Sequence, residues 1–297
     1  MQFLRHAHTH SQLSDTMKPL NVLFLNAGLT SAHWVTSTFI FDNQTTTPFE
    51  YIRAVSPIPS SPSSHIYDPN TNPHSPDLIC GRNASLGWSH PKVASVTAGD
   101  EVGFFVDVGL TVPPSMYHPG FASAWLSRME GGSQGELDDY QGESMSTPAC
   151  PERARERLIY GVGGWYKIHQ TAGRTSQSVN FDDPTNKPYY DATKALWGTF
   201  RSTSWTFTIP ASTPPGKYLV RWEHIFPNPQ DAQFYVNCAH VEVINDRTGV
   251  EPGEDYKVKI PGVYTRGQKD VYFSSYDYGL EGSLDGFVPP KPGVWQG

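Results

Sequence analysis

Short runs of strand-forming residues, separated by clusters of turn-forming residues, are the feature that most limits how this chain can fold. Clusters such as Ala98-Gly99-Asp100 and Pro214-Pro215-Gly216 interrupt the chain between the runs. Seven or more short strands with such punctuation favour two packed antiparallel sheets. We therefore predict an all-β fold, an immunoglobulin-like or fibronectin-like β-sandwich with long loops. The runs cover residues 34–41, 101–108, 164–169, 204–209, 217–223, 233–238 and 241–244.

The rest of the chain fits a single domain with large loops. Of the 297 residues, 17% are charged and 26 each are Gly and Pro, which argues against a helical bundle. Residues 45–77 and 131–157 are rich in turn formers, and connections of this length often carry binding surfaces. The only helix that the sequence predicts is short and covers residues 151–158. We find no internal repeat and predict one domain over residues 33–297.

Charge and short motifs limit the partners of the protein. The net charge of −7 provides no basic surface for a nucleic acid. No segment approaches the roughly 18 apolar residues that span a bilayer, so we expect no membrane partner. The sequons at Asn43 and Asn83 agree with glycosylation on a secretory route. Three cysteines, Cys80, Cys150 and Cys238, leave one odd thiol if two of them are paired.

The first 32 residues predict a leader that is removed. Residues 1–16 show no strand or helix period, and although their His-x-His-x-His run over residues 6–10 could bind metal, a misplaced start is the simpler explanation. From residue 17 the chain has one lysine, an apolar stretch over residues 20–29 and then Thr30-Ser31-Ala32. This is the order of a secretory signal peptide. We expect cleavage after Ala32, which leaves His33 at the mature N-terminus.

A histidine at the mature N-terminus can chelate a metal with two nitrogen groups of the same residue. Its amine and its imidazole are both nitrogen donors, and the amine loses its proton readily because its pKa is about 8. One more histidine would complete a three-nitrogen site, and tetragonal nitrogen ligands favour copper. His118, in a turn after a strand, is the candidate. On its own, His118 would more often be an ordinary surface residue.

A series of short motifs extends along the chain after residue 32. They lie at residues 33, 76–80, 97–100, 118–120, 164–168, 197–199, 205–210, 215–221, 232–239, 259–264 and 293–295. In this order they resemble the motifs of the auxiliary-activity family 9 lytic polysaccharide monooxygenases of fungi, formerly a glycoside hydrolase family. The resemblance covers the whole segment from His33 to about Trp295, and its strength lies in the order of motifs that are individually weak.

The resemblance implies a copper site, with one copper per chain. His33 and His118 match the two copper-binding histidines of the family, and Tyr235 matches its axial tyrosine. Gln233 matches a glutamine that hydrogen-bonds oxygen at the copper. Alternation along the strand places Gln233 and Tyr235 on one face, which is consistent with a shared site.

The resemblance also implies a disulfide and contacts with a sugar polymer. Cys80 and Cys238 match the disulfide that the family shares, and Cys150, which has no counterpart, is expected to be a thiol without a role. Tyr264 and Tyr278 lie in segments where the family displays aromatic rings. Such rings hold polysaccharides by stacking on sugar rings.

Two positions near these motifs, Asn228 and Phe121, differ from the residues that the family usually has. Asn228 stands where the family usually has a histidine close to the copper, and an asparagine cannot donate a proton with a pKa near neutrality. His224 is nearby in sequence, but we expect strand alternation to place it on a different face. Phe121 replaces a proline after the His118 turn. These differences favour an altered oxidation rate.

The sequence therefore predicts a secreted, copper-dependent lytic polysaccharide monooxygenase that cleaves cellulose or a related β-1,4-glucan at C1 or C4. We expect a monomer that receives electrons from a small molecule or a protein. The alternative is a copper-binding, polysaccharide-associated protein with little or no monooxygenase activity, which Asn228 favours. The acidic residues Asp138, Asp139 and Glu143 would suit a glycosidase, but a solvated acidic loop is their ordinary explanation.

The mature N-terminus is the first testable prediction. We expect N-terminal sequencing of the secreted protein to begin at His33, because the small residues Thr30-Ser31-Ala32 precede it. A secreted protein that begins at Met1 or Met17 would contradict both the leader and the metal chelate.

Overall fold

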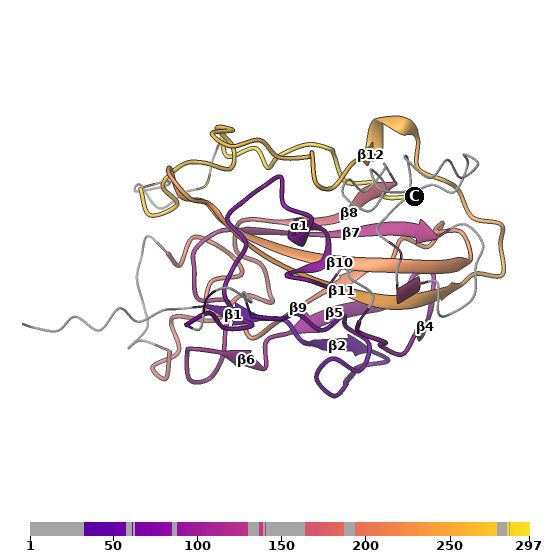
Figure 1. Cartoon of the computed structure of the whole chain (residues 1–297), viewed down its shortest axis with the longest axis horizontal. Helices are drawn as coiled ribbons and strands as arrows, with labels where there is room; N and C mark the ends of the chain where they lie inside the picture. The colour runs from indigo at the N-terminus through magenta and orange to yellow at the C-terminus, as the bar shows by residue number, and fades with distance from the viewer. Residues whose placement is uncertain are drawn as a thin grey trace, which may run out of the picture. The chain divides into compact units, whose positions relative to one another are not determined.

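The chain forms two main β-sheets, which confirms the predicted all-β sandwich (Figure 1). The structure is a computed structural model that describes residues 33–57, 61, 63–84, 88–129, 137–138, 140, 164–186, 194–277, 284 and 286–297. The larger sheet has the strand order β12-β8-β7-β10-β11-β4, and the smaller sheet has the order β3-β2-β5-β9. A short pair, β1 with β6, completes the described strands. All neighbours are antiparallel except β11 and β4, which are parallel.

The strands differ widely in length. The bounds are β1 Trp34–Val35, β2 Thr38–Phe41, β3 Gln44–Thr45, β4 Ala94–Thr97, β5 Glu101–Phe105, β6 Val108–Gly109, β7 Phe121–Met129, β8 Trp165–Thr171, β9 Ser204–Thr208, β10 Gly216–Phe226, β11 Gln233–Ile244 and β12 Lys257–Val258. The helical segments with described bounds are short, α1 over Asp77–Cys80 and a 3-10 turn over Glu254–Tyr256, and Leu137 and Asp138 are helical as well. None of the helices in the described ranges is long and apolar enough to cross a membrane.

The longest strands, β10 and β11, form the centre of the larger sheet. They pair without interruption from Gly216 opposite Val243 to Phe226 opposite Gln233. Almost every residue of β10 is buried, on both faces. A strand of this kind reads as a nearly continuous apolar run, because neither of its faces meets water.

One face of β10 and β11 packs against the smaller sheet. Tyr218, Val220 and Trp222 of β10 contribute to this inner core together with Phe104 of β5 and Phe207 of β9. The ring of Trp222 lies parallel to that of Phe207, with 5.9 Å between the ring centres. Burying each such side chain contributes roughly 2–3 kcal/mol, so this layer accounts for much of the stability of the fold.

The opposite face of the larger sheet is covered by loops instead of by a third sheet. Leu219 and Ile225 of β10 pack there against Trp197 and Val271 from two of these loops and against Leu78 of α1. We call this the outer core. The described residues of these loops are therefore a packed layer of the domain, and the larger sheet is covered on both faces.

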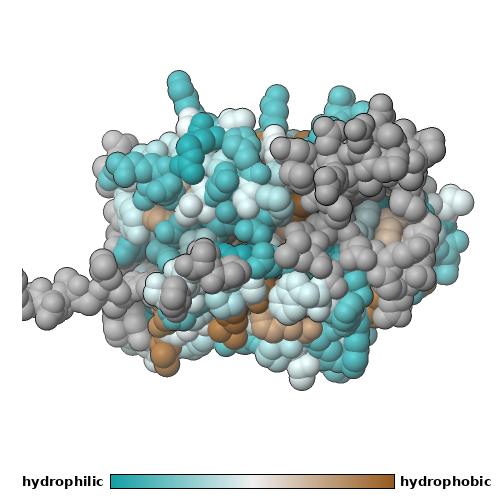
Figure 2. Space-filling view, viewed as in Figure 1, coloured by the Kyte–Doolittle hydropathy of each residue, from teal (hydrophilic) through white to brown (hydrophobic). Residues whose placement is uncertain are grey.

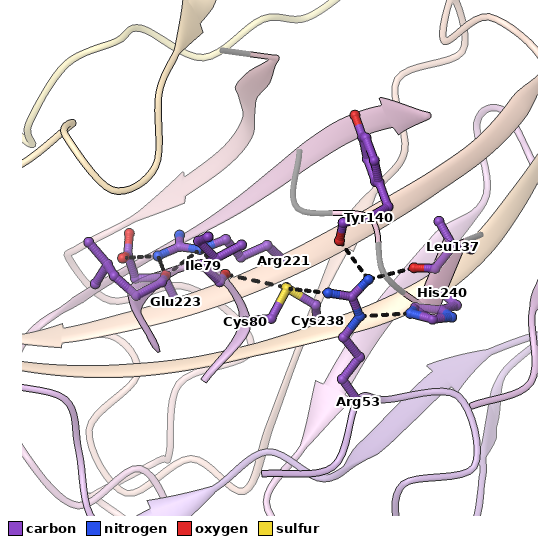
Figure 3. The surroundings of a disulfide bond; sticks show 10 residues. Arg53, Ile79, Cys80, Leu137, Tyr140, Arg221, Glu223, Cys238 and His240 are labelled. Carbon is purple, nitrogen blue, oxygen red and sulfur yellow. Dashed lines mark hydrogen bonds and ion pairs between the residues drawn. A yellow bond between two sulfur atoms is a disulfide. The ribbon is translucent and has the colours of Figure 1, made fainter. Parts of the chain in front are cut away.

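A disulfide and an arginine fasten α1 to the outer face of the larger sheet (Figure 3). The predicted bridge between Cys80 of α1 and Cys238 of β11 is confirmed. Arg221 of β10 donates to the main-chain oxygens of Leu78 and Ile79, at 2.9 Å each. These oxygens belong to the last turn of a very short helix, where carbonyl groups lack partners within the helix. The arginine therefore supplies hydrogen bonds that α1 cannot make itself.

A second arginine, Arg53, holds another loop on the same face. Its guanidinium donates to the main-chain oxygens of Leu137 and Tyr140 and to Nε2 of His240 on β11. Figure 3 shows this guanidinium between the loop carbonyl groups and the histidine ring. Because His240 accepts at Nε2, it is neutral, and burial lowers its pKa to about 2.

The charge of Arg221 is balanced by Glu223, two residues along the same strand. Both side chains are fully buried and lie 2.5 Å apart. Glu223 also accepts hydrogen bonds from the Tyr264 hydroxyl at 2.7 Å and from Ser123 at 3.3 Å. A buried ion pair is stable only when its remaining hydrogen-bonding sites are satisfied, which these neighbours achieve for the carboxylate.

The strand predictions differ from the structure in the bounds and in the number of strands. The runs predicted over residues 34–41 and 101–108 are each divided between two strands, β1 and β2 in the first and β5 and β6 in the second, and β3, β4 and β12 were not predicted. Residues 233–238 and 241–244 form one strand, β11, and the run predicted over residues 217–223 extends to Phe226. Strand β7 was not predicted, because Ala122, Ser123 and Ala124 have low strand propensity; its place between β8 and β10 decides its conformation. The predicted helix over residues 151–158 and Cys150 lie outside the described residues.

Among the residues that Figure 2 colours by hydropathy, hydrophilic and intermediate ones predominate, and hydrophobic ones appear as small patches. Asn43 is exposed at the tip of the hairpin between β2 and β3, where Asp42 and Asn43 both have positive φ angles. The amide of Asn83, by contrast, donates to Ser56 Oγ at 2.6 Å. Asn43 is thus the better placed of the two sequons to carry a glycan.

The buried ion pair generates a prediction on stability. We expect Glu223→Gln to lower the free energy of unfolding by about 3–5 kcal/mol, because Arg221 then keeps a buried charge without an anion. Tyr264→Phe removes one hydrogen bond to the carboxylate and should cost about 1.5–3 kcal/mol. Denaturant unfolding measures both values. Lys92→Met, at an exposed pair with Glu50, is the control and should leave stability unchanged.

Two outcomes would contradict this account of the outer core. One is a Glu223→Gln variant as stable as the parent protein. The other is a double variant whose loss equals the sum of the two single losses, since contacts to one carboxylate should not be additive.

Candidate metal centre

The candidate centre lies at the end of the sandwich where β10 and β11 are joined. Tyr235 is the third residue of β11, and its partner across the hairpin is His224 of β10. Partners in an antiparallel pair project to the same face, so both rings point toward the inner core. The predicted alternation is also observed, since Tyr235 belongs to the inner core and Phe234 to the outer core.

Trp34 connects the N-terminal strand to this place. Its ring stacks on the ring of Tyr235, with 3.7 Å between the centres and planes only 6° apart. Strand β1 is held further by β6, where Trp34 pairs with Gly109, and the oxygen of His33 accepts from the amide of Leu110 at 2.9 Å. The backbone of His33 is therefore fixed, which brings its imidazole to within 6.2 Å of Tyr235 between ring centres.

His118 reaches the same place from the turn before β7. Gly120 allows this approach, because a Cβ atom there would lie 2.0 Å from the oxygen of Ile225 on β10. The imidazole of His118 stacks on Phe226, with 4.4 Å between ring centres. It lies 6.0 Å from the ring of His33 and 6.1 Å from that of Tyr235. The three residues predicted to bind copper are thus brought together.

The two ring nitrogens of His118 are the most informative atoms of the site. Both are shielded from solvent, and neither has a hydrogen-bond partner within the described part of the chain. A buried polar atom without a partner costs about 1–3 kcal/mol. Burial, with smaller contributions from His33 and Lys194, lowers the pKa of His118 to about 3. The imidazole is therefore neutral at ordinary pH, which is the form that binds metals.

Tyr235 and Gln233 form a hydrogen-bonded pair beside these rings. The hydroxyl of Tyr235 donates to Oε1 of Gln233 at 2.7 Å. Burial raises the pKa of Tyr235, and the neighbouring Asp68 and Tyr276 act in the same direction, so the phenol stays protonated. The amide of Gln233 keeps its two N–H donors for other partners, since only its oxygen accepts from the tyrosine.

A carboxylate that the sequence analysis missed lies next to His33. Oδ1 of Asp68 is 3.0 Å from Nδ1 of His33. Asp68 belongs to a long connection without strand or helix periodicity, so no pattern in the sequence indicates its position. Among the residues that the structure describes, no three His, Cys, Asp or Glu side chains converge into a ready-made metal cluster.

The expectation that His224 lies on a different face is wrong, because the hairpin register pairs it directly with Tyr235. Its ring lies 5.1 Å from Trp34 and 6.2 Å from Tyr235, and its Nδ1 is 3.3 Å from the hydroxyl of Thr199. Burial lowers the pKa of His224 to about 3, and His118 contributes. A neutral imidazole therefore lies behind the site. Counting residues in both directions from the turn between β10 and β11 pairs His224 with Tyr235, which shows that the two side chains project to the same face.

Asn228 is found in the turn that follows β10. Its side-chain oxygen accepts from the main-chain N–H groups of Gln230 at 3.1 Å and Asp231 at 3.3 Å. Asparagine is common in turns because its side chain can replace main-chain partners in this way. The amide oxygen of Asn228 thus stabilises the turn by accepting two main-chain hydrogen bonds. Phe121, the other departure, faces the outer core, away from the site.

Tyr264 does not lie on the surface as expected. Its side chain is 1% exposed and is bound to Glu223, so it cannot stack on a sugar ring. Tyr278 lies outside the described residues. Tyr276, which the sequence analysis overlooked, is 38% exposed and packs edge-on against Phe226, the residue that stacks on His118.

The acidic residues considered for a glycosidase do not form a described pair of carboxylates. Asp138 lies 2.6 Å from Nδ1 of His90, while Asp139 and Glu143 are outside the described ranges. Nothing described there supports paired acid and base groups of the kind that glycosidases use.

Comparison with known proteins indicates a family. The sequence model of Auxiliary Activity family 9 (formerly GH61) matches residues 150–282. The chain is 31% identical over 276 residues to the AA9 family lytic polysaccharide monooxygenase G of Aspergillus tamarii, covering 91% of this chain and 68% of that protein. It is 30% identical over 238 residues to monooxygenase U of Thermothielavioides terrestris, covering 77% of this chain and 76% of that one.

Solved structures share the fold at lower identity. A cellulose-active polysaccharide monooxygenase from M. thermophila aligns with a TM-score of 0.55 and 20% identity, over 89% of this chain and 99% of that one. Cel61B from Hypocrea jecorina, a glycoside hydrolase family 61 member, aligns with a TM-score of 0.54 and 16% identity, over 89% and 100%. At this identity the likeness concerns the sandwich fold.

The position of Asn228 generates a prediction. We expect Asn228→Ala to lower the free energy of unfolding by about 1 kcal/mol, because two N–H groups of the turn lose their acceptor. Asn228→Asp keeps an acceptor in the same place and should retain most of this stability. Thermal unfolding of the two variants measures the difference. Equal stability of Asn228→Ala and the parent protein would show that the turn does not depend on this side chain.

Proposed function

The chain belongs to Auxiliary Activity family 9, and on that basis we propose that it is a secreted, copper-dependent lytic polysaccharide monooxygenase that acts on cellulose or a related β-1,4-glucan. The observation that carries this proposal is the unpartnered, shielded imidazole of His118 beside His33 and Tyr235. Neutral imidazole nitrogen is a donor that copper prefers, and a metal would satisfy the nitrogen that the protein leaves without a partner.

The donor set that we propose combines three side chains with one main-chain group. Cleavage after Ala32 frees the amine of His33, which joins the imidazole of the same residue as a chelate. His118 would supply the third nitrogen, and Tyr235 would supply an oxygen. The stack of Trp34 on Tyr235 fixes the angle at which the N-terminal residue meets the tyrosine.

Bound copper supplies the one-electron chemistry with which oxygen or hydrogen peroxide removes a hydrogen at C1 or C4 of the sugar. The residues around it have separate tasks. Gln233, fixed by the Tyr235 hydroxyl, presents its amide N–H groups as donors next to the centre. Tyr235 stays protonated, and the aromatic rings of Trp34 and Phe226 exclude water from the inner side.

Exposed rings close to the site suit a polymer of neutral sugars. Tyr276 presents its ring at the surface beside Phe226, and Lys194 lies over the same ring at 5.4 Å. In the loop that leads to Asp68, the rings of His65 and Tyr67 stack on each other with 4.8 Å between centres. Aromatic faces of this kind bind the apolar faces of sugar rings. We propose Tyr276 as a substrate contact in place of Tyr264.

The second candidate function is a copper-binding, polysaccharide-associated protein with little or no monooxygenase activity. Asn228 favours it, because an asparagine stands where the family usually has a histidine, and its oxygen is engaged in the turn. The buried imidazole of His224 lies 6.2 Å from the ring of Tyr235, measured between ring centres. The two functions differ in products and share the metal site.

The experiment compares His118→Ala with His74→Ala, a matched control in an exposed loop. Both are made in the mature protein that begins at His33. We expect His118→Ala to weaken copper binding by at least about 100-fold, more than the roughly 10- to 100-fold typical of losing an outer partner. His74→Ala should bind as the parent does. Calorimetry measures affinity, and mass spectrometry detects aldonic or ketoaldose products from cellulose with copper and ascorbate.

Each result selects one function. Tight copper binding with oxidised products that disappear in His118→Ala supports the monooxygenase. Tight binding without oxidised products from cellulose or other β-glucans supports the binding protein. Products without oxidised ends, formed in the presence of a copper chelator, would indicate a hydrolase and contradict both.

A further inference from the structure

Asp68 lies against the nitrogen of His33 that a metal would need. Its Oδ1 is 3.0 Å from His33 Nδ1, and both side chains are about one fifth exposed. The second carboxylate oxygen accepts from the main-chain N–H of His65 at 2.7 Å. The carboxylate is thus oriented by its own loop, with one oxygen used locally and the other directed at the histidine.

The loop that carries Asp68 is fastened on both sides. Arg82 donates to the main-chain oxygens of Asp68 at 3.1 Å and of Pro69 at 3.3 Å. Two residues after Asp68, Asn70 forms a bridge with Phe234 of β11, with hydrogen bonds of 3.1 and 2.8 Å. Phe234 is the neighbour of Tyr235, so the loop is tied to the strand that builds the site. The carboxylate is therefore held in place by the fold.

The pairing also occupies one ring nitrogen of His33. A carboxylate oxygen accepts hydrogen bonds, so in this contact Nδ1 of His33 is the donor. A metal held at Nδ1 would replace this hydrogen bond. The carboxylate then loses its donor and faces a cation in the same direction. Leaving it there without a partner would be unfavourable for a group that is only partly solvated.

The separation of the two atoms fits two ligands of one metal. Bonds from first-row metals to histidine nitrogen and carboxylate oxygen are about 2.0–2.2 Å long. Two such ligands at a right angle are about 2.8–3.1 Å apart, close to the 3.0 Å between Nδ1 and Oδ1. We propose that Asp68 supplies an anionic oxygen to the metal that His33 holds, in addition to the nitrogen donors. This proposal rests on the proposed function.

An anionic oxygen donor would change the balance between the oxidation states of copper. Cu(II) favours nitrogen and oxygen donors, whereas Cu(I) is bound better by soft donors. Asp68 should therefore stabilise Cu(II) much more than Cu(I). The carboxylate would make the metal harder to reduce, and it would give this chain a centre that differs from one with neutral donors and the tyrosine alone.

The test uses the mature protein and the variant Asp68→Asn, which keeps the shape and removes the charge. We expect its affinity for Cu(II) to fall roughly 10- to 100-fold, while its affinity for Cu(I) changes less than about 3-fold. The electron paramagnetic resonance spectrum of the Cu(II) form should change as well. Competition titrations with chelators specific for each oxidation state measure the two affinities.

Asp100→Asn is the matched control, because Asp100 accepts from the main chain of Thr97 at the far end of the larger sheet. It should leave both affinities and the spectrum unchanged. Asp68→Glu keeps the charge and should retain a Cu(II) affinity above that of Asp68→Asn, which separates charge from folding. Unfolding midpoints of all variants are measured in the metal-free state.

Two results would overturn the role of Asp68 and leave the proposed function intact. The first is an unchanged Cu(II) affinity and spectrum in Asp68→Asn. The second is an equal loss for Cu(II) and Cu(I), which would mean that Asp68 only orients His33. A parent protein that binds no copper at its mature N-terminus would overturn the proposed function itself.

Discussion

The continuous pairing of β10 with β11 is the interaction on which the rest of the structure depends. Because the side chains of a strand alternate, this one pair serves two purposes on its two faces. The inner face carries Trp222 into the core between the sheets and, further along, His224 and Tyr235 to the candidate metal centre. The outer face carries Arg221, Glu223 and Cys238, which fasten loops. A slip of one residue would exchange the faces and destroy both functions.

Loops of this length need such fastening, since they lack ladders of main-chain hydrogen bonds. Arg53 and Arg221 provide donors to loop carbonyl groups in a region that water does not reach (Figure 3). Arg82 does the same for the loop of Asp68. Arginine suits this role because its planar group offers five donors and remains charged. The candidate site is thus made of loop residues and strand residues that are held to one another by buried polar contacts.

The sandwich was predicted from local strand and turn signals, and the disulfide from the resemblance of the motifs to those of the family. The same resemblance named His33, His118 and Tyr235, whose rings lie about 6 Å from one another in the structure. Strand β7 escaped because its Ala and Ser residues are strand-forming only by position. His224 was assigned to the wrong face, since its orientation depends on the register of a hairpin and not on its own run. No sequence pattern indicates the positions of Asp68 and Tyr276, because both lie in loops whose course depends on contacts with distant residues.

The central claim is that the main-chain amine of His33 completes a copper site with the side chains of His33 and His118. The most direct test compares copper binding by two chains that differ by one residue, one beginning at His33 and the other at Ala32. The additional alanine converts the amine of His33 into an amide and changes no side chain of the site. The account predicts that the chain beginning at Ala32 binds Cu(II) at least about 100-fold more weakly, since it loses one nitrogen of the chelate. Equal affinity of the two chains would contradict the claim.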